Sequence, residues 1–212
     1  MKRILFQGDS ITDAERDREN PGDMGRGYPL LVRSELGYEQ PGVYEFLNRG
    51  MSGNRIVDIY GRIKVDIINL KPDVMSLLIG VNDVWHEVSR KNGISAEKYF
   101  MLYDLLIQEL LTELPELKLM ILEPFVLKGS ATEQAWDVFY PEVLERAKMA
   151  KKIAQKYNLV FIPLQQAFEN AASKSETICW LRDGVHPTPE GHQLIKKAWI
   201  EAFRTLDIEE KP

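Results

Sequence analysis

Five short apolar runs, separated by segments with helical spacing, constrain the fold of this chain more than any other feature. The runs cover residues 4–6, 43–47, 74–79, 118–122 and 159–162. Short apolar runs bounded by turn signals are typical of strands buried on both faces. Strands that alternate with helices form parallel sheets, because each parallel connection needs a crossover. The sequence therefore predicts an α/β fold with helices on both faces of a five-stranded parallel sheet.

The intervening segments carry the apolar spacing of helices. Isoleucines recur at helical spacing over residues 56–69, and this predicted helix ends before Pro72. Ser95 is a suitable N-cap for a helix that reaches residue 114, where Pro115 prevents continuation. Residues 12–27 lack periodicity and form a predicted surface loop near the end of the first strand. Further helices are predicted over residues 28–36, 140–157, 164–172 and 189–206.

Length and charge limit the class of protein. With 212 residues, of which 44% are apolar, the chain can bury one substantial core, so we expect a single domain over residues 1–212. The formal net charge of −5 argues against a nucleic-acid partner, because phosphate binding requires clustered Lys and Arg. No apolar segment is long enough to cross a bilayer, so no membrane partner is expected.

The compartment is inferred from two further observations. The first strand begins too near residue 1 to leave room for a signal peptide, which predicts a cytoplasmic protein. Cys179 is the only cysteine, so an internal disulfide is excluded, in agreement with a reducing compartment. We expect Cys179 to be a small buried side chain.

Three polar turns follow predicted strands. Ser10 comes after the first strand, Gly53 after the second and Asn82 after the third. In parallel sheets ligands gather beyond the carboxyl ends of the strands, so these three turns should share one rim. By itself a serine after a strand is more typical of a helix cap than of a nucleophile.

The segment that precedes the last helix contains Asp183 and His186, three residues apart. A serine nucleophile needs a base that takes its proton and a carboxylate that holds this base in the correct tautomer. One turn could supply both groups. The backbone amides of Ser10 and Gly53 and the side-chain amide of Asn82 are candidate donors to an oxyanion. Together these residues indicate an acyl-transfer site.

Four motifs, spread over nearly the whole chain, carry a resemblance to a known family. They are Gly8-Asp9-Ser10, Met51-Ser52-Gly53-Asn54, Gly80-Val81-Asn82-Asp83 and Asp183-Gly184-Val185-His186-Pro187. In this order they resemble the motifs of the SGNH hydrolase superfamily, also called the GDSL family of esterases and lipases. The first motif continues with Ile11-Thr12 in place of the family's leucine, a variant common in its carbohydrate esterases.

The resemblance implies a flavodoxin-like three-layer α/β/α sandwich and catalysis without a metal or another cofactor. It implies that Ser10 is the nucleophile, His186 the base and Asp183 the orienting acid, with Ser10, Gly53 and Asn82 forming the oxyanion hole. Residues 48–55, 82–85 and 180–188 look most like bacterial acetylxylan esterases. Intracellular members of that kind act on xylo-oligosaccharides, and they often form homo-oligomers.

The leading hypothesis is a serine esterase that removes acetyl groups from small carbohydrates, acetylated xylo-oligosaccharides in particular, through an acetyl-enzyme on Ser10. A lysophospholipase or thioesterase with the same catalytic groups is the main alternative. A non-catalytic carbohydrate-binding module is a remoter alternative. Another is a metal-dependent phosphodiesterase, whose ligands would be Asp9, Asp183, His186 and His192.

Three side chains are candidates for substrate binding. Trp85 and Trp180 could each offer a flat apolar face to a sugar ring, and core packing or an oligomer interface would account for them equally well. Arg55 could anchor a polar substrate or form a structural ion pair with Asp58 or Asp9.

Two acidic residues and one histidine beside the predicted site have expected structural roles. Asp9 and Asp83 should accept hydrogen bonds from backbone amides and so hold their loops in shape. His192 lies inside the last predicted helix, where a surface or packing role is expected.

Overall fold

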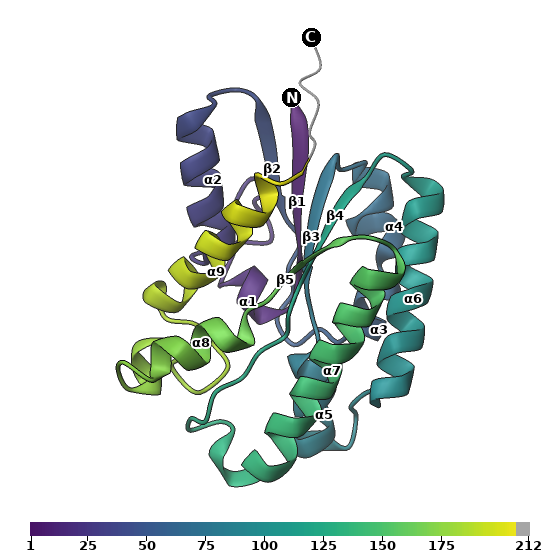
Figure 1. The fold of residues 1–212 in the computed structure, drawn as a ribbon. Helices are drawn as coiled ribbons and strands as arrows, with labels where there is room; N and C mark the ends of the chain where they lie inside the picture. The colour runs from purple at the N-terminus through teal and green to yellow at the C-terminus, as the bar shows by residue number, and fades with distance from the viewer. Residues whose placement is uncertain (207–212) are drawn as a thin grey trace.

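The computed structural model describes residues 1–206, in which five parallel strands form one sheet in the order β2-β1-β3-β4-β5 (Figure 1). This strand order is that of flavodoxin-like folds. The predicted α/β class and five-stranded parallel sheet are therefore confirmed. The strands are β1 (Lys2–Gly8), β2 (Tyr44–Asn48), β3 (Val74–Leu78), β4 (Lys118–Leu122) and β5 (Val160–Ile162).

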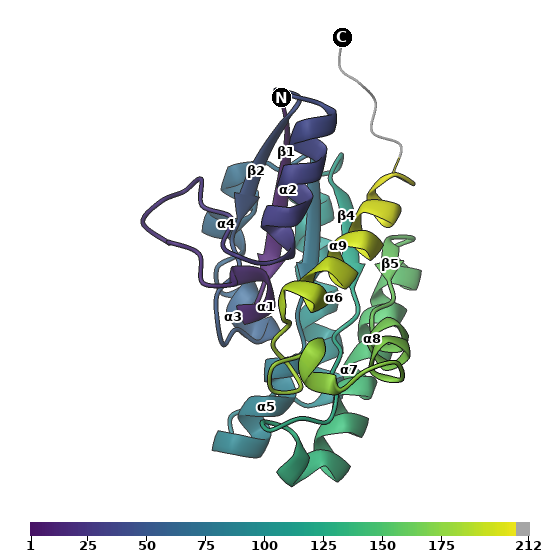
Figure 2. The ribbon, with the colours of Figure 1, turned by 90° about the vertical axis from the view of Figure 1, so that its left-hand side faces the viewer.

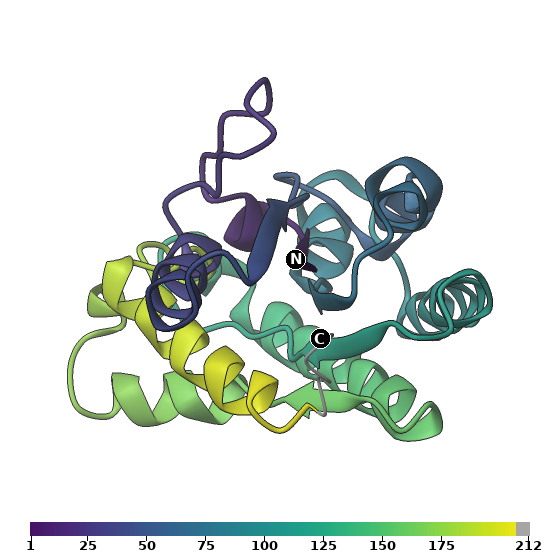
Figure 3. The ribbon, with the colours of Figure 1, turned by 90° about the horizontal axis from the view of Figure 1, so that it is seen from above.

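Helices cover both faces of the sheet, as views from the side and from above show (Figures 2 and 3). Successive side chains of a strand point to opposite faces, so Ile4 and Phe6 pack in one apolar core and Leu5 packs in the other. The first core is covered mainly by α2 (Tyr28–Glu39), α8 (Gln165–Ala172) and α9 (Pro189–Phe203). The second is covered by α3 (Ile56–Tyr60), α4 (Ile63–Asp66), α6 (Ala96–Glu113) and the second half of α7 (Trp136–Lys156).

The predicted helix over residues 56–69 is wrong as one continuous element. Helix α3 ends before Gly61, α4 is a single turn, and a 3₁₀ turn occupies Ile68–Leu70. Glycine is a poor residue for a helix interior, which favours an interruption at Gly61. The predicted apolar face is nevertheless buried, because the separate turns still direct their isoleucines into the second core.

The helix α5 (Val81–Arg90) was not predicted, because a polar turn was expected after the third strand. It begins directly after Gly80 and buries its first turn, Val81 to Val84, while Trp85 and Val88 on the same face pack, partly buried, against the first core. Ser95 caps α6 as predicted, accepting a bond from the amide of Lys98 at 3.4 Å. Helix α7 begins at Trp136 rather than at residue 140 and contains Pro141.

Two other expectations concern the surface. Cys179 is exposed, at the end of the 3₁₀ turn Thr177–Cys179, so its predicted burial is wrong. This turn lies in the first part of the irregular stretch between α8 and α9, where residues 173–176 and 178 are exposed as well. Within residues 1–206 no helix has both the length and the apolar character that a membrane crossing requires.

Candidate active site

The three polar turns lie at one edge of the sheet, as predicted. In the sheet β1 lies between β2 and β3, and these are the strands that precede Ser10, Gly53 and Asn82. Beyond the end of β2 the chain stays beside β1, because the amide of Met51 donates to the carbonyl of Gly8 at 3.0 Å. The sheet topology thus gathers residues that are far apart in the sequence.

Ser10 is the first residue of α1 (Ser10–Asp13), a single helical turn directly after β1. Asp9 caps this turn, with its carboxylate accepting a bond from the amide of Ile11 at 3.0 Å. The sharp connection depends on Gly8, since a Cβ atom there would lie 2.4 Å from the carbonyl oxygen of Leu78 and 2.4 Å from Oγ1 of Thr12. The strand end and the capped turn therefore fix Ser10 at the rim.

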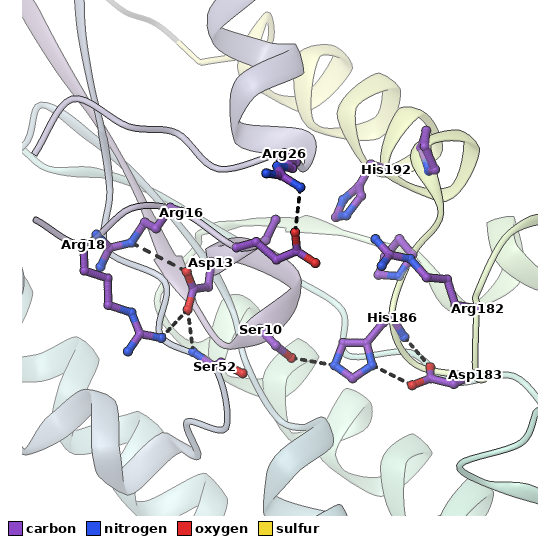
Figure 4. A pocket seen from close by; sticks show the side chains of 14 residues that line it. Ser10, Asp13, Arg16, Arg18, Arg26, Ser52, Arg182, Asp183, His186 and His192 are labelled. Atoms are coloured by element: carbon purple, nitrogen blue, oxygen red, sulfur yellow. Dashed lines mark hydrogen bonds and ion pairs between the residues drawn. The ribbon is translucent and has the colours of Figure 1, made fainter. Parts of the chain in front are cut away.

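Ser10, His186 and Asp183 form a chain of hydrogen bonds (Figure 4). Ser10 Oγ lies 3.0 Å from His186 Nε2, and His186 Nδ1 lies 2.7 Å from Asp183 Oδ2. The other carboxylate oxygen of Asp183 accepts bonds from the backbone amides of Val185 and His186, at 2.9 and 2.8 Å. The acid is thus held within its own turn and directed at the imidazole.

The electrostatics of this pair keep the acid charged. Burial raises the pKa of Asp183, but the bonds from His186 and the two amides outweigh it and lower the pKa to about 2. The bond to Asp183 raises the pKa of His186, against the opposing effect of burial. With Asp183 ionised, the neutral imidazole carries its proton on Nδ1, and Nε2 is free to accept the proton of Ser10.

The candidate oxyanion donors lie in loops that are bonded to one another. Asn82 is the second residue of α5, and its side-chain amide donates one hydrogen bond to the carbonyl of Asn54 at 3.1 Å. The second proton of this amide remains available, because each NH₂ group is a double donor. Gly53 adopts a φ of +84°, and a Cβ atom there would meet no other atom within 4 Å, so its turn is open to an approaching ligand.

Asp9 and Asp83 hold these loops, in agreement with their expected role. Asp83 is fully buried and accepts the backbone amide of Ile56 at 3.1 Å, which ties the start of α5 to the start of α3. Burial raises the pKa of Asp9 to about 7 and raises that of Asp83 well above its usual range. Both carboxyls are therefore structural groups below the rim.

A cavity of about 740 Å³ opens beside Ser10 and His186. Sequence reasoning missed Asp13, whose carboxylate accepts the backbone amide of Ser52 at 2.9 Å and pairs with Arg18 at 2.5 Å. Asp13 thereby links the helical turn of Ser10 to the residue before Gly53. The predicted loop over residues 12–27 does lie near the site, although its first two residues belong to α1. It contributes the cavity residues Asp13, Ala14, Glu15, Arg16, Arg18 and Arg26.

The three candidate substrate contacts lie in different places. Trp85 packs beside His186, with ring centroids 5.7 Å apart, but it does not line the cavity itself. Trp180 does not line the cavity; it packs against the apolar core and donates from Nε1 to Ser175 at 2.7 Å. Arg55 does not line it either, because its guanidinium bonds both carboxylate oxygens of Asp58, at 2.9 and 3.1 Å. Of the two readings of Arg55, the structure shows the ion pair with Asp58.

The residues suggested as metal ligands do not assemble into a metal site. His192 is only 4% exposed, and its Nδ1 accepts the backbone amide of Tyr28 at 3.1 Å. Asp183 and His186 bond to each other, and Asp9 caps α1. Among residues 1–206 no three His, Cys, Asp or Glu side chains are grouped as metal ligands would be.

Comparison with known proteins agrees with this geometry. The model of the GDSL-like lipase/acylhydrolase family matches residues 6–194. An acetylxylan esterase from Geobacillus stearothermophilus is 30% identical over 207 residues, which cover 94% of this chain and 92% of that protein.

Solved structures of similar proteins have the same fold. A protein of Parabacteroides merdae described as a GDSL-like lipase superposes with a TM-score of 0.90 at 36% identity, over 95% of this chain and 94% of that one. The acetylxylan esterase Axe2 from Geobacillus stearothermophilus superposes with a TM-score of 0.86 at 26% identity, over 99% and 97% of the two chains. From its motifs, its fold and these relatives, the chain belongs to the GDSL-like lipase/acylhydrolase family, that is, to the SGNH hydrolases.

Proposed function

We propose that this SGNH hydrolase is a carbohydrate acetyl esterase in which Ser10, His186 and Asp183 form the catalytic triad. The observation that carries the proposal is the hydrogen-bonded chain from Ser10 Oγ through His186 to Asp183 at the rim. The open turn of Gly53 and the amide of Asn82 belong to the two neighbouring turns.

In the proposed mechanism, Ser10 Oγ attacks the acetyl carbonyl while His186 Nε2 takes its proton. The ionised Asp183 stabilises the imidazolium and keeps its orientation. The amides of Ser10 and Gly53 and the side chain of Asn82 donate to the oxyanion, and each such donor is worth about 2.7–4 kcal/mol. His186 then gives its proton to the departing alcohol oxygen, and water releases acetate from Ser10 by the same sequence of steps.

The lining of the cavity favours a polar alcohol. Of the lining residues in the described part of the chain, only Ala14, Pro187 and Pro189 lack a polar side chain. A fatty acyl chain placed there would lie against guanidinium and carboxylate groups. It would displace their water and offer them no hydrogen bonds in return, which is unfavourable. A long apolar group on either half of the ester is therefore disfavoured in this cavity.

Acetylated xylo-oligosaccharides are the substrates that we propose, on the basis of the relatives. Axe2 is described as an acetyl-xylooligosaccharide esterase, and it has been solved as catalytic mutants in which a serine or an aspartate is replaced by alanine. The similarity extends over nearly the whole of both chains. Trp85, beside the catalytic imidazole, is the aromatic candidate for contact with the sugar.

A cytoplasmic location and assembly into a homo-oligomer are further parts of the proposal. Exposed apolar side chains such as Tyr38 and Met101, 87% and 67% exposed, are available for contacts between copies. Cell fractionation tests the location, and light scattering of the purified protein tests the assembly.

The experiment that tests the function measures acetate release from acetylated xylose, xylobiose, glucose and N-acetylglucosamine derivatives, by wild type and by Ser10→Ala. We expect release from the xylose-based esters, and its loss in the variant. Aryl acetate, butyrate and octanoate test the acyl chain, with acetate the expected optimum. Activity that survives Ser10→Ala would contradict the mechanism, and faster hydrolysis of octanoate would support the lipolytic alternative.

A further inference from the structure

One side of the cavity presents cationic and hydrogen-bond donor groups beside the catalytic histidine. Arg26, Arg182 and His192 come from three different parts of the chain, and all line the cavity that contains Ser10 and His186 (Figure 4). Arg26 belongs to the loop before α2, Arg182 to the turn before α9, and His192 to the first turns of α9. The chain as a whole has a net charge of −5, so a cationic wall here runs against the overall charge.

Arg182 has a free guanidinium next to the catalytic turn. Its backbone amide donates to the carbonyl of His186 at 2.8 Å, which fixes its main chain. Its side chain is exposed and forms no hydrogen bond or ion pair with the described residues. An arginine presents five donors in a planar fork that matches a carboxylate.

His192 presents a second donor of known orientation. Its Nδ1 accepts the amide of Tyr28, so the proton of the neutral ring is on Nε2. This Nε2 has no partner among the described residues, although the ring is 4% exposed and lines the cavity. The ring is held in place by Gly27, where a Cβ atom would lie 2.7 Å from Cε1 of His192.

Among the described residues, the carboxylates around the cavity leave Arg182 without an ion pair and engage Arg26 only in an exposed one. Asp183 is engaged by His186 and two backbone amides, and Asp13 by Arg18 and the amide of Ser52. Glu15 pairs with Arg26 at 3.1 Å, but the two side chains are 62% and 82% exposed. Exposed ion pairs are weak because solvent screens them, so a ligand carboxylate can replace Glu15 at Arg26.

The mechanism indicates which half of the ester lies here. His186 must deliver its proton to the departing alcohol oxygen, so the alcohol half lies on the side of His186 Nε2. Arg182 belongs to the same turn, and His192 is six residues further on. We propose that the alcohol half of the substrate carries a carboxylate, as a uronic acid does, bound by Arg182, Arg26 and the Nε2–H of His192. This inference rests on the proposed function, because it places an acid group on the acetylated sugar.

The test compares acetate release from an O-acetylated methyl glucuronoside, from its neutral methyl ester and from an acetylated methyl xyloside. Wild type, Arg182→Gln and Arg90→Gln are assayed in low and high salt. Arg90 is the control, because it is an exposed arginine that does not line the cavity. In wild type we expect kcat/KM for the acid to exceed that for its neutral ester by about 10-fold, since hydrogen bonds to charged groups are stronger than those to neutral groups.

We expect Arg182→Gln and high salt to bring this ratio close to one, while Arg90→Gln preserves it. A ratio of one in wild type, or the same ratio in Arg182→Gln, overturns the inference and leaves the esterase proposal intact. Hydrolysis of none of the three esters contradicts the proposed function itself. A hemisuccinate ester of methyl xyloside tests the other source of a carboxylate. A preference for it, with none for the glucuronoside, overturns the assignment to the alcohol half.

Discussion

Two histidines six residues apart line the same cavity and have opposite surroundings. His186 bonds a carboxylate, and this bond raises its pKa. His192 bonds only a backbone amide, and burial together with the charges of Arg182 and His186 lowers its pKa to about 4. The first can exchange a proton with Ser10 near neutral pH, whereas the second remains neutral. A histidine in the cavity is therefore not catalytic by residue type alone. What distinguishes the two is the partner of Nδ1, which is a carboxylate in His186 and a backbone amide in His192.

The same contrast separates the groups that face the reacting ester from those that hold the cavity wall. Asp183 and Asn82 belong to the first class, since Asp183 acts on the base and Asn82 donates from the rim. Nδ1 of His192 and the carboxylate of Asp13 belong to the second, because both accept backbone amides that fix the ends of loops. Nε2–H of His192 is the donor proposed above for the substrate carboxylate, which is remote from the reacting ester. Substitutions in the first class should have large effects on kcat. Those in the second should affect stability, and should affect kcat only slightly, through the geometry of the loops.

The strongest test of this contrast is Asp183→Asn. Loss of the carboxylate removes the group that orients His186 and stabilises its protonated form, so we expect kcat to fall about 10³–10⁴-fold. The residual activity should also change its pH dependence. Activity requires a neutral His186, and removal of the bond that raises its pKa moves the acidic limb of kcat/KM to lower pH. An unchanged acidic limb would show that Asp183 does not set the pKa of His186.

Asn82→Ala sharpens the contrast on the oxyanion side. Removal of one donor should lower kcat by about 10²–10³-fold, with little change in KM, because the bond strengthens only as the oxyanion forms. The same substitution removes the bond to the carbonyl of Asn54, so thermal unfolding is measured in parallel. A fall in kcat that is matched by a large loss of stability would place Asn82 in the second class.

His192→Gln tests the structural histidine. Between its folded pKa of about 4 and its ordinary value of 6.5, the unfolded chain binds more protons at this site than the folded one. The contribution of His192 to the free energy of unfolding therefore has its full value above pH 6.5. It decreases as the pH falls towards 4, by up to about 3 kcal/mol. The variant lacks this titration, so the stability of wild type relative to the variant should decrease over that range. Urea unfolding at pH 4.5, 5.5 and 7 measures it, and a difference that is independent of pH would be contrary to the account.

Asp13→Ala should have the smallest effect. Without the acceptor for the amide of Ser52, the turn that carries Gly53 loses one tether, and we expect kcat to fall about 10-fold. Asp13→Asn retains an acceptor oxygen and should restore most of this loss. Asp17→Ala, in the exposed part of the same loop, is the matched control. Equal losses in Asp13→Asn and Asp13→Ala would assign the effect to the charge rather than to the tether.

Much of the fold was predictable because each strand contains a short apolar run bounded by turn residues. Residues 74–78 are buried along their whole length, so their pattern predicts a strand without ambiguity. Helix α5 escaped prediction because Asn82 and Asp83, directly after β3, indicated a polar turn, although its apolar residues have helical spacing and pack against the core. The interruption at Gly61 escaped because separate turns can satisfy the same apolar spacing as one helix.

The site was predictable to the extent that motifs carry it. Ser10, Asp183 and His186 were named from their motifs, and the structure brings them into hydrogen-bond contact. Asp13 and the arginines of the cavity stand in a segment without periodicity, where only the density of charge beside Ser10 was a signal. The partner of Arg55 could not be chosen from sequence. Asp58 is near it along the chain, and Asp9 lies in a turn predicted at the same edge of the sheet.

The most direct test of the central claim is the rate at which a serine-directed phosphonate modifies the enzyme, followed by peptide mapping. We expect a single adduct on Ser10 in wild type, at least 100-fold slower modification in His186→Gln, and a much smaller change in His192→Gln. Modification of another residue, or equal rates in wild type and His186→Gln, would contradict the assignment of Ser10 as a nucleophile activated by His186.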